Sequence, residues 1–307
     1  MTVDLAGRPR WRGQPGRLEV HYLTATDIAT GAGLWLHHEV VAPTGSDPYA
    51  HGWLSLFPPD AAPTTTRFGP LPTEPTPDGC WFRAGDIEMT ATTARGHAGG
   101  VDWDLRWDAG DRPLWTFPRW VWHRQVLPAA QVLPSPTTRL TGTVNGTSYD
   151  GSGGVAHTYG HGNAQRWVWF HGDLGDGDVL EIVAATARRP GLRALPPLPL
   201  LQLRVGGRDW PRDPLAAAPL LRAHLEQNAF RVSGIVGVRR IRVEVTLPPD
   251  RCVALGYTDP DGATATCTNT ERADAVIRLD RLSGRGWRTE CEWTLTGTAH
   301  AEIGTRP

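Results

Sequence analysis

Short segments in which apolar and polar residues alternate run through most of the chain, and they constrain its fold more than any other feature. Residues 241–247, Ile-Arg-Val-Glu-Val-Thr-Leu, alternate without exception, and residues 101–107 alternate with tryptophans on one face. Successive side chains of a strand point to opposite faces, so this period of two is typical of half-buried strands. The pattern recurs at residues 18–24, 34–41, 167–171, 179–184, 275–279 and 292–298. It predicts an all-β protein.

Turn-forming residues separate these segments and show where strands are not expected. The 35 Gly and 27 Pro are spread along the chain as punctuation, and only residues 216–227 resemble a helix. We expect a long surface loop at residues 58–79. Residues 190–199 contain four prolines, which exclude a central strand because proline cannot donate to the ladder.

The 307 residues exceed what one eight-stranded barrel needs. They predict two antiparallel barrels or sandwiches side by side, with little helix. The passage between them is placed in the Gly-, Thr- and Ser-rich residues 140–154, which gives domains of 1–145 and 146–307.

Composition excludes several classes of function. The 31 basic and 32 acidic residues nearly balance, which gives no electrostatic footprint for nucleic acid. All basic residues are Arg, so chemistry that needs a lysine amine, such as a Schiff base or a P-loop, is excluded. Four Cys lack any C-x-x-C spacing, and no apolar run approaches a membrane span. We expect a cytoplasmic protein with no metal and no integral membrane segment.

Tryptophan is the most unusual component, with 14 residues in the chain. Pairs that share one face of a presumed strand are Trp103 with Trp107, Trp120 with Trp122, and Trp167 with Trp169. Such pairs form aromatic shelves, which either pack a barrel core or line a cavity for a large apolar ligand. Since two ordinary barrel cores need fewer tryptophans, we favour the cavity.

Histidines supply the second chemical signal. His157, His161 and His171 lie within one segment, and His171 shares a strand face with Trp167 and Trp169. A histidine beside an aromatic wall is suited to acid–base chemistry near neutral pH, although a satisfied structural polar group is the alternative. The run His37-His38-Glu39 alternates between faces, so it does not form a ready metal triad.

The same region resembles a known family. Residues 142–149, 153–160 and 165–171 are similar to the central motif of the lipocalin-like hydratase and cyclase superfamily, which includes carotenoid 1,2-hydratase, tocopherol cyclase and lipocalin-like Diels–Alderases. Residues 122–131 and 293–302 are also similar. The resemblance implies two lipocalin-like β-barrel domains with the active pocket near their junction. It also implies an apolar polyene or prenyl substrate, and no metal or organic cofactor.

The resemblance carries over to particular residues. His157 matches the motif histidine, Trp167 and Trp169 match the Trp-x-Trp of the cyclases, and His171 matches the polar residue that follows. Thr158 and Tyr159 stand where the family often has acidic or amide residues, and the segment is one residue shorter. These departures leave cyclisation, isomerisation, hydration and pericyclic chemistry open.

These observations predict a cofactor-independent cyclase, isomerase or hydratase of secondary metabolism, acting on an apolar terpenoid, polyene or polyketide. The predicted catalytic residues are His157, His161, His171 and Glu39. The predicted substrate-binding residues are Tyr159, Trp167, Trp169, Trp122, His38 and Trp53. The alternative is a carrier that binds an apolar small molecule without transforming it. We favour the enzyme because a passive apolar sleeve has no need of three histidines and a tyrosine in one motif.

Overall fold

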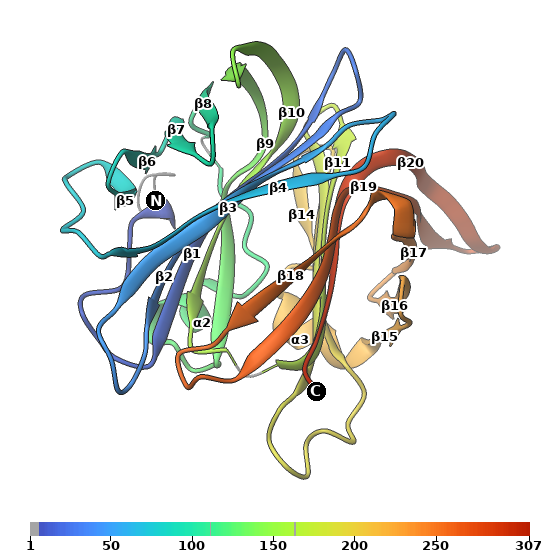
Figure 1. Ribbon diagram of the computed structural model, residues 1–307. Coiled ribbons are helices and arrows are strands. Elements are labelled where there is room, and N and C mark those ends of the chain that lie inside the picture. The colour runs from blue at the N-terminus through green and yellow to red at the C-terminus, as the bar shows by residue number, and fades with distance from the viewer. Residues whose placement is uncertain (1–5, 111, 163) are drawn as a thin grey trace. The chain divides into compact units, whose positions relative to one another are not determined.

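The computed structural model describes residues 6–110, 112–162 and 164–307, and these residues form two antiparallel sheets with very little helix (Figure 1). Two compact units result. The first comprises Met1–Trp115, Arg119–Gly162 and Thr258–Thr264, and the second comprises Thr116–Pro118, Asn163–Tyr257 and Ala265–Pro307. The prediction of an all-β chain built on two large antiparallel sheets is confirmed.

The first unit contains a ten-stranded sheet in the order β4-β3-β2-β1-β10-β9-β8-β7-β6-β5. Its strands are β1 (Arg17–Asp27), β2 (Gly33–Ala42), β3 (Tyr49–Phe57), β4 (Thr64–Pro72), β5 (Cys80–Ala84), β6 (Ile87–Thr90), β7 (Thr93–Ala98), β8 (Val101–Trp107), β9 (Ala129–Val144) and β10 (Thr147–Gly160). A short helix, α2 (Arg119–Arg124), packs on β9. Because β4 lies against β7, the sheet curls on itself as a barrel does.

The second unit contains another sheet, in the order β14-β13-β12-β11-β20-β19-β17-β16-β15, and β18 pairs with β19 beside this path. The strands are β11 (Ala164–Gly175), β12 (Asp178–Ala187), β13 (Leu198–Val205), β14 (Arg208–Trp210), β15 (Leu221–Leu225), β16 (Ala229–Val236), β17 (Arg239–Thr246), β18 (Val253–Thr258), β19 (Thr264–Ser283) and β20 (Gly286–Thr305). The helical turns are α3 (Pro214–Ala217), η1 (Ala218–Leu220) and η2 (Pro249–Arg251). β13 lies near β15, so this sheet also curls.

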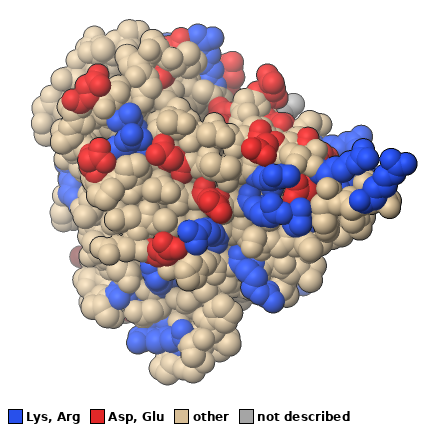
Figure 2. Space-filling model, turned by 90° about the vertical axis from the view of Figure 1, so that its right-hand side faces the viewer, with Lys and Arg blue, Asp and Glu red and all other residues tan. Residues whose placement is uncertain are grey.

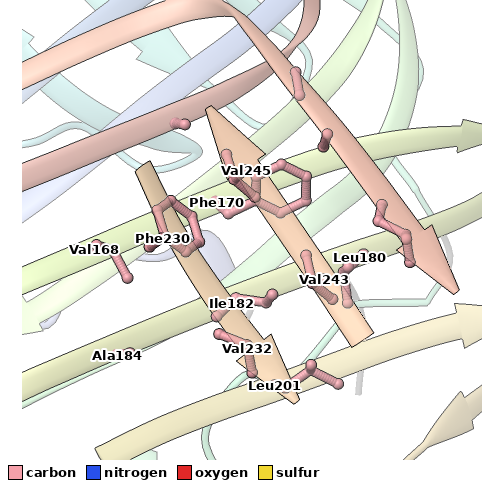
Figure 3. Packing of buried hydrophobic residues seen from close by; sticks show 14 of the residues in the cluster. Val168, Phe170, Leu180, Ile182, Ala184, Leu201, Phe230, Val232, Val243 and Val245 are labelled. Carbon is pink, nitrogen blue, oxygen red and sulfur yellow. The ribbon is translucent and has the colours of Figure 1, made fainter. Parts of the chain in front are cut away.

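Strand alternation explains both cores. In β17, Ile241, Val243 and Val245 are buried, whereas Arg242 and Glu244 are exposed. Figure 2 shows how charged side chains are spread over one face of the molecule. In the second unit, the buried residues of this kind gather around Phe170 and Phe230 (Figure 3). The first unit has its own cluster of buried leucines, phenylalanines and tryptophans.

Two predictions about local structure were wrong in part. Of the predicted helix at 216–227, only residues 216–220 are helical, in α3 and η1; residues 221–225 form strand β15, because Leu221 and Leu225 face the core in a period of two and pair with β16. The predicted loop at 58–79 contains β4, whose threonines favour a strand and whose position at the edge of the ladder tolerates Pro70. The prediction that prolines keep residues 190–199 out of a central strand holds only for residues 190–197. β13 begins at Leu198 and includes Pro199, which is tolerated because β14 pairs only with Leu203–Val205 and leaves that side of Pro199 at an edge.

The predicted domain boundary at 145/146 falls on the turn between β9 and β10. Both strands belong to the first sheet. Within the described residues, no helix has the length and apolar character needed to cross a membrane.

Candidate functional site

One face of the second sheet carries aromatic and titratable side chains where a surface strand would carry solvated polar groups. In β11, Val168 and Phe170 point into the core of the second unit. Trp167, Trp169 and His171 alternate with them and therefore share the opposite face, as the sequence predicts. The local fold of β11 thus places a histidine at the end of a tryptophan shelf.

Glu181 of β12 holds His171 in one orientation. The two residues lie opposite each other in the ladder, and His171 Nδ1 donates to Glu181 Oε2 over 3.0 Å. The other carboxylate oxygen of Glu181 accepts from Trp169 Nε1. Glu181 is fully buried, so these bonds stabilise a carboxyl group that water does not reach.

The remaining ring nitrogen of His171, Nε2, has no hydrogen-bond partner among the described residues. His171 is 3% exposed, and its Nε2 is buried without a hydrogen bond from any described residue. A buried imidazole nitrogen without a partner costs free energy, and a ligand group that hydrogen-bonds to it would recover that cost. With Nδ1 committed to Glu181, Nε2 is the atom that can accept or donate a proton.

Glu302 of β20 completes the tryptophan shelf with a carboxyl group. It lies opposite Trp169 in the ladder and accepts a hydrogen bond of 2.8 Å from Trp167 Nε1. Burial raises the pKa of Glu302 to about 7, against the opposing effect of the Trp167 bond and with some help from the charge of Glu181. A carboxyl group with this pKa holds its proton in a large fraction of molecules at neutral pH and can donate it.

A second histidine–carboxyl pair, His300 with Glu271, lies next to the pair of His171 and Glu181. His300 is opposite His171 in the ladder, and its ring centroid lies 3.9 Å from that of Trp169. His300 Nδ1 lies 2.6 Å from Glu271 Oε1. Burial and the nearby charge of Glu302 raise the pKa of Glu271 well above its ordinary value. Two histidines and several carboxyl groups therefore share one aromatic surface.

We call this surface the Trp/His/Glu face. It consists of Trp167, Trp169, His171, Glu181, Glu271, His300 and Glu302. Indole rings can pack against an apolar or cationic molecule, while Glu302 and His171 can move protons. Of these residues, sequence reasoning assigned roles only to Trp167, Trp169 and His171. His300 and Glu302 could have been predicted from the sequence, because they are two residues apart in a strand segment that resembles the family.

His157, the predicted catalytic histidine of the first unit, has both ring nitrogens engaged. Nδ1 lies 2.8 Å from the Ala6 carbonyl oxygen and Nε2 lies 2.8 Å from Glu19 Oε1. The Ala6 carbonyl oxygen can only accept, so Nδ1 carries a proton. The contact between Nε2 and Glu19 needs a second proton, on one of those two groups. Glu19 also accepts from the backbone N–H groups of Arg10 and Trp11. This network, fully buried at His157 and part-buried at Arg10 and Trp11, ties the N-terminal segment to β1 and β10.

The neighbours of His157 include two predicted binding residues. Its ring meets Trp122 edge-on, with ring centroids 4.8 Å apart, and stacks on His21 at 4.1 Å. The Arg10 guanidinium lies over both Trp122 and Tyr159. Trp122, Tyr159 and the exposed His161 line a small surface pocket of the first unit, whereas His157 lies behind Trp122 and does not line it.

Glu39, the predicted acid, lies on the other face of the same sheet. His37 Nε2 and His51 Nε2 lie 3.2 and 3.1 Å from Glu39 Oε2, and the His37 ring stacks on Trp53 at 4.0 Å. Burial opposes ionisation of Glu39, but the hydrogen bonds from the two histidines prevail and lower its pKa to about 2. Glu39 is therefore a carboxylate at neutral pH and has no proton to give. His38 points the opposite way, as strand alternation predicts, and burial lowers its pKa to about 3.

Comparison with known sequences gives close relatives of unknown activity. No protein-family model matches the chain. The uncharacterized proteins MT0513 and Rv0493c, from two strains of Mycobacterium tuberculosis, are each 48% identical to it over 306 residues. The match covers 98% of this chain and 90% of each relative.

Solved structures share the fold at low sequence identity. A candidate AttH protein (NE1406) of Nitrosomonas europaea superposes with a TM-score of 0.60 at 11% identity, covering 94% of this chain and 92% of the other. CghA in complex with Sch210972 gives 0.58 at 13%, covering 94% and 88%. Kievitone hydratase of Nectria haematococca gives 0.54 at 11%, covering 97% and 90%. The chain therefore shares the lipocalin-like fold of these solved structures, as the sequence predicts.

Proposed function

The chain belongs to the same family as the uncharacterized Mycobacterium tuberculosis proteins MT0513 and Rv0493c, and on that premise we propose that it is a cofactor-independent cyclase, isomerase or hydratase. Its substrate is an apolar terpenoid, polyene or polyketide of secondary metabolism. The observation that carries the proposal is His171, which Glu181 orients through Nδ1 while its buried Nε2 has no described partner.

The Trp/His/Glu face supplies the two proton-transfer groups that such reactions need. Glu302 donates its proton to an alkene carbon or a carbonyl oxygen, because its pKa of about 7 leaves much of it neutral at physiological pH. A cation that develops on the substrate is stabilised by the ring faces of Trp167 and Trp169. For a diene substrate, hydrogen bonding and shape suffice, with no net proton transfer.

His171 Nε2 accepts the proton that is released in the second step, whether the reaction is a cyclisation or a hydration. In a cyclisation, a carbon–carbon bond closes onto the cation and His171 Nε2 takes the proton that leaves the neighbouring carbon. In a hydration, water adds to the cation and His171 Nε2 takes the proton that the water loses. Glu181 stabilises the resulting imidazolium, as a buried carboxylate does for an oriented histidine. The product therefore has either the substrate's mass or that mass plus one water.

Relatives in the fold support this choice of chemistry. Kievitone hydratase is a hydratase by name, and CghA has been crystallised with the small molecule Sch210972. Both resemble this chain over nearly its full length, although their low sequence identity transfers only the fold. The proton-transfer roles are assigned to His171 and Glu302 because His157 has both nitrogens engaged and Glu39 is ionised.

The experiment is a ligand panel read in two ways. Prenyl quinols, linear carotenoids and polyene polyketides are titrated against intrinsic tryptophan fluorescence, and each mixture is then analysed by mass spectrometry. Glu302→Gln is compared with Glu226→Gln, a matched change at an exposed glutamate of the second unit. We expect quenching in all three proteins, and product with wild type and Glu226→Gln only.

Other outcomes decide against the proposal. Quenching with every ligand recovered intact makes the protein a carrier. Equal product from wild type and Glu302→Gln removes the acid role of this carboxyl group while leaving a pericyclic reaction in place. No quenching by any ligand contradicts an apolar binding surface.

A further inference from the structure

Two hairpin tips of the second sheet form a surface that is both basic and apolar. The β19–β20 tip, residues 281–288, reads Arg-Leu-Ser-Gly-Arg-Gly-Trp-Arg and contains three arginines and no acidic residue. The neighbouring β16–β17 turn presents Ile235 and Val238. The two tips are joined, because Leu282 N donates to the Val238 carbonyl oxygen over 2.8 Å. We call residues 235–238 together with 281–288 the basic tip.

The arginines just below the basic tip are paired with carboxylates. Arg240 Nε and Arg278 Nε each lie 2.9 Å from an oxygen of the fully buried Asp280. Arg239 Nε donates to Glu290 over 2.9 Å. These are strand-face ion pairs, and Asp280 is shared by Arg240, Arg242 and Arg278.

The arginines of the basic tip are different. Arg281, Arg285 and Arg288 are exposed, and within the described chain no carboxylate lies at ion-pair distance from any of them. Asp280 and Glu290, the nearest acidic residues in sequence, are already paired with other arginines. Figure 1 shows the β19–β20 hairpin projecting beyond the other strands, and Figure 2 shows basic side chains on a projecting part of the surface.

Aliphatic side chains stand exposed among these charges. Ile235 is 48% exposed, Val238 is 52% exposed and Leu282 is 47% exposed. Trp287 in the same tip lies under the Arg240 guanidinium, 4.8 Å from the ring centroid. A cluster of exposed apolar groups and unpaired cations is typical of an interaction surface and not of a solvated strand face.

We propose that the basic tip docks the protein on an anionic lipid bilayer. Unpaired arginines are attracted to anionic headgroups, and aliphatic side chains beside them can enter the interface between headgroups and acyl chains. A nucleic acid would use the arginines but would leave the aliphatic side chains facing water. Docking through the basic tip does not depend on the Trp/His/Glu face. It would bring the protein to the lipid bilayer, in which apolar molecules dissolve.

Vesicle co-sedimentation tests this docking with the full chain. The probes are phosphatidylcholine vesicles with and without phosphatidylglycerol, at low and high salt. We expect wild type to sediment with the anionic vesicles at low salt only, since surface attraction is screened by salt. In the triple variant Arg281→Glu, Arg285→Glu and Arg288→Glu, partitioning falls by at least about 100-fold, because the loss of each arginine accounts for roughly fivefold and the glutamates add repulsion.

Two further proteins separate local docking from net charge. The variant Arg208→Glu, Arg212→Glu and Arg222→Glu makes the same charge change at exposed arginines outside the basic tip and should keep most of the binding. The uncharged change Val238→Ser with Leu282→Ser should weaken binding at constant charge. Circular dichroism checks that each variant is folded. The proposal is overturned by equal losses in both arginine variants, by binding to neutral vesicles alone, or by no binding at low salt.

Discussion

Replacing Glu302 by glutamine tests the electrostatics of the Trp/His/Glu face without a known substrate. Glutamine has the shape of the protonated acid, and its Oε1 can still accept from Trp167 Nε1. The variant therefore keeps the packing and the hydrogen bond and removes only the ability to ionise. The difference in stability between the two proteins then reports the cost of charging Glu302.

The magnitude follows from the shift of the Glu302 pKa. Burial raises this pKa from 4.5 to about 7. Above pH 4.5 the unfolded chain loses the proton that the folded protein keeps, so the free energy of unfolding decreases with rising pH. Each pKa unit corresponds to about 1.4 kcal/mol, which gives a loss of about 3 kcal/mol between pH 4.5 and 7. Above about pH 7 both states are ionised and the loss stops growing.

The assay is chemical denaturation of wild type and Glu302→Gln from pH 4.5 to pH 8.5, followed by tryptophan fluorescence. Because the chain has two compact units, more than one unfolding transition can occur. The free energies of unfolding of the two proteins are compared for the transition whose midpoint the substitution shifts. Glu302→Gln should gain stability relative to wild type as pH rises, by about 3 kcal/mol in total. A pH-independent difference, or one of opposite sign, would refute the reasoning.

Three further predictions concern other parts of the structure. Phe230→Ala removes a fully buried ring of the second core and should lower the free energy of unfolding by about 3–5 kcal/mol in calorimetry; a loss below about 1 kcal/mol would contradict its central position. Glu39→Gln should destabilise the protein by up to about 3 kcal/mol at pH 7, because the lowered pKa of Glu39 contributes stability above pH 4.5 that disappears as pH falls toward 2; an equal effect at pH 7 and pH 2.5 would be inconsistent with this. Trp169→Phe keeps the ring but removes the donor to Glu181, so product formation should fall about tenfold; unchanged turnover would show that this bond does not position Glu181.

Much of the fold could be predicted because a strand shows its period in the sequence. Residues 241–247 alternate, and Ile241, Val243 and Val245 face the core. The period fails where a segment is short or lies at an edge. Leu221 to Leu225 alternates over only five residues and directly follows the helical turns α3 and η1, so the sequence does not show where the helix ends. β4 lies at a sheet edge and has little apolar content, so its pairing with β3 left no clear trace.

The candidate site was only partly predictable, because it depends on register between distant strands. The sequence places Trp169 and His171 on one face, since both lie on one strand. It does not show that Glu181 and Glu302 come opposite them, because those residues belong to β12 and β20. Nor does it show that His157 is occupied at both nitrogens, because its partners Ala6 and Glu19 are set by how the N-terminal segment packs.

The most direct test of the account compares ligand binding and product formation in His171→Ala and His224→Ala. His224 is an exposed histidine of the second unit and serves as the matched control. We predict that both variants still quench on binding the converted ligand, and that only His171→Ala loses product, by about 100-fold or more, as expected for an acid–base residue. Wild-type turnover by His171→Ala would contradict the assignment of proton transfer to the Trp/His/Glu face.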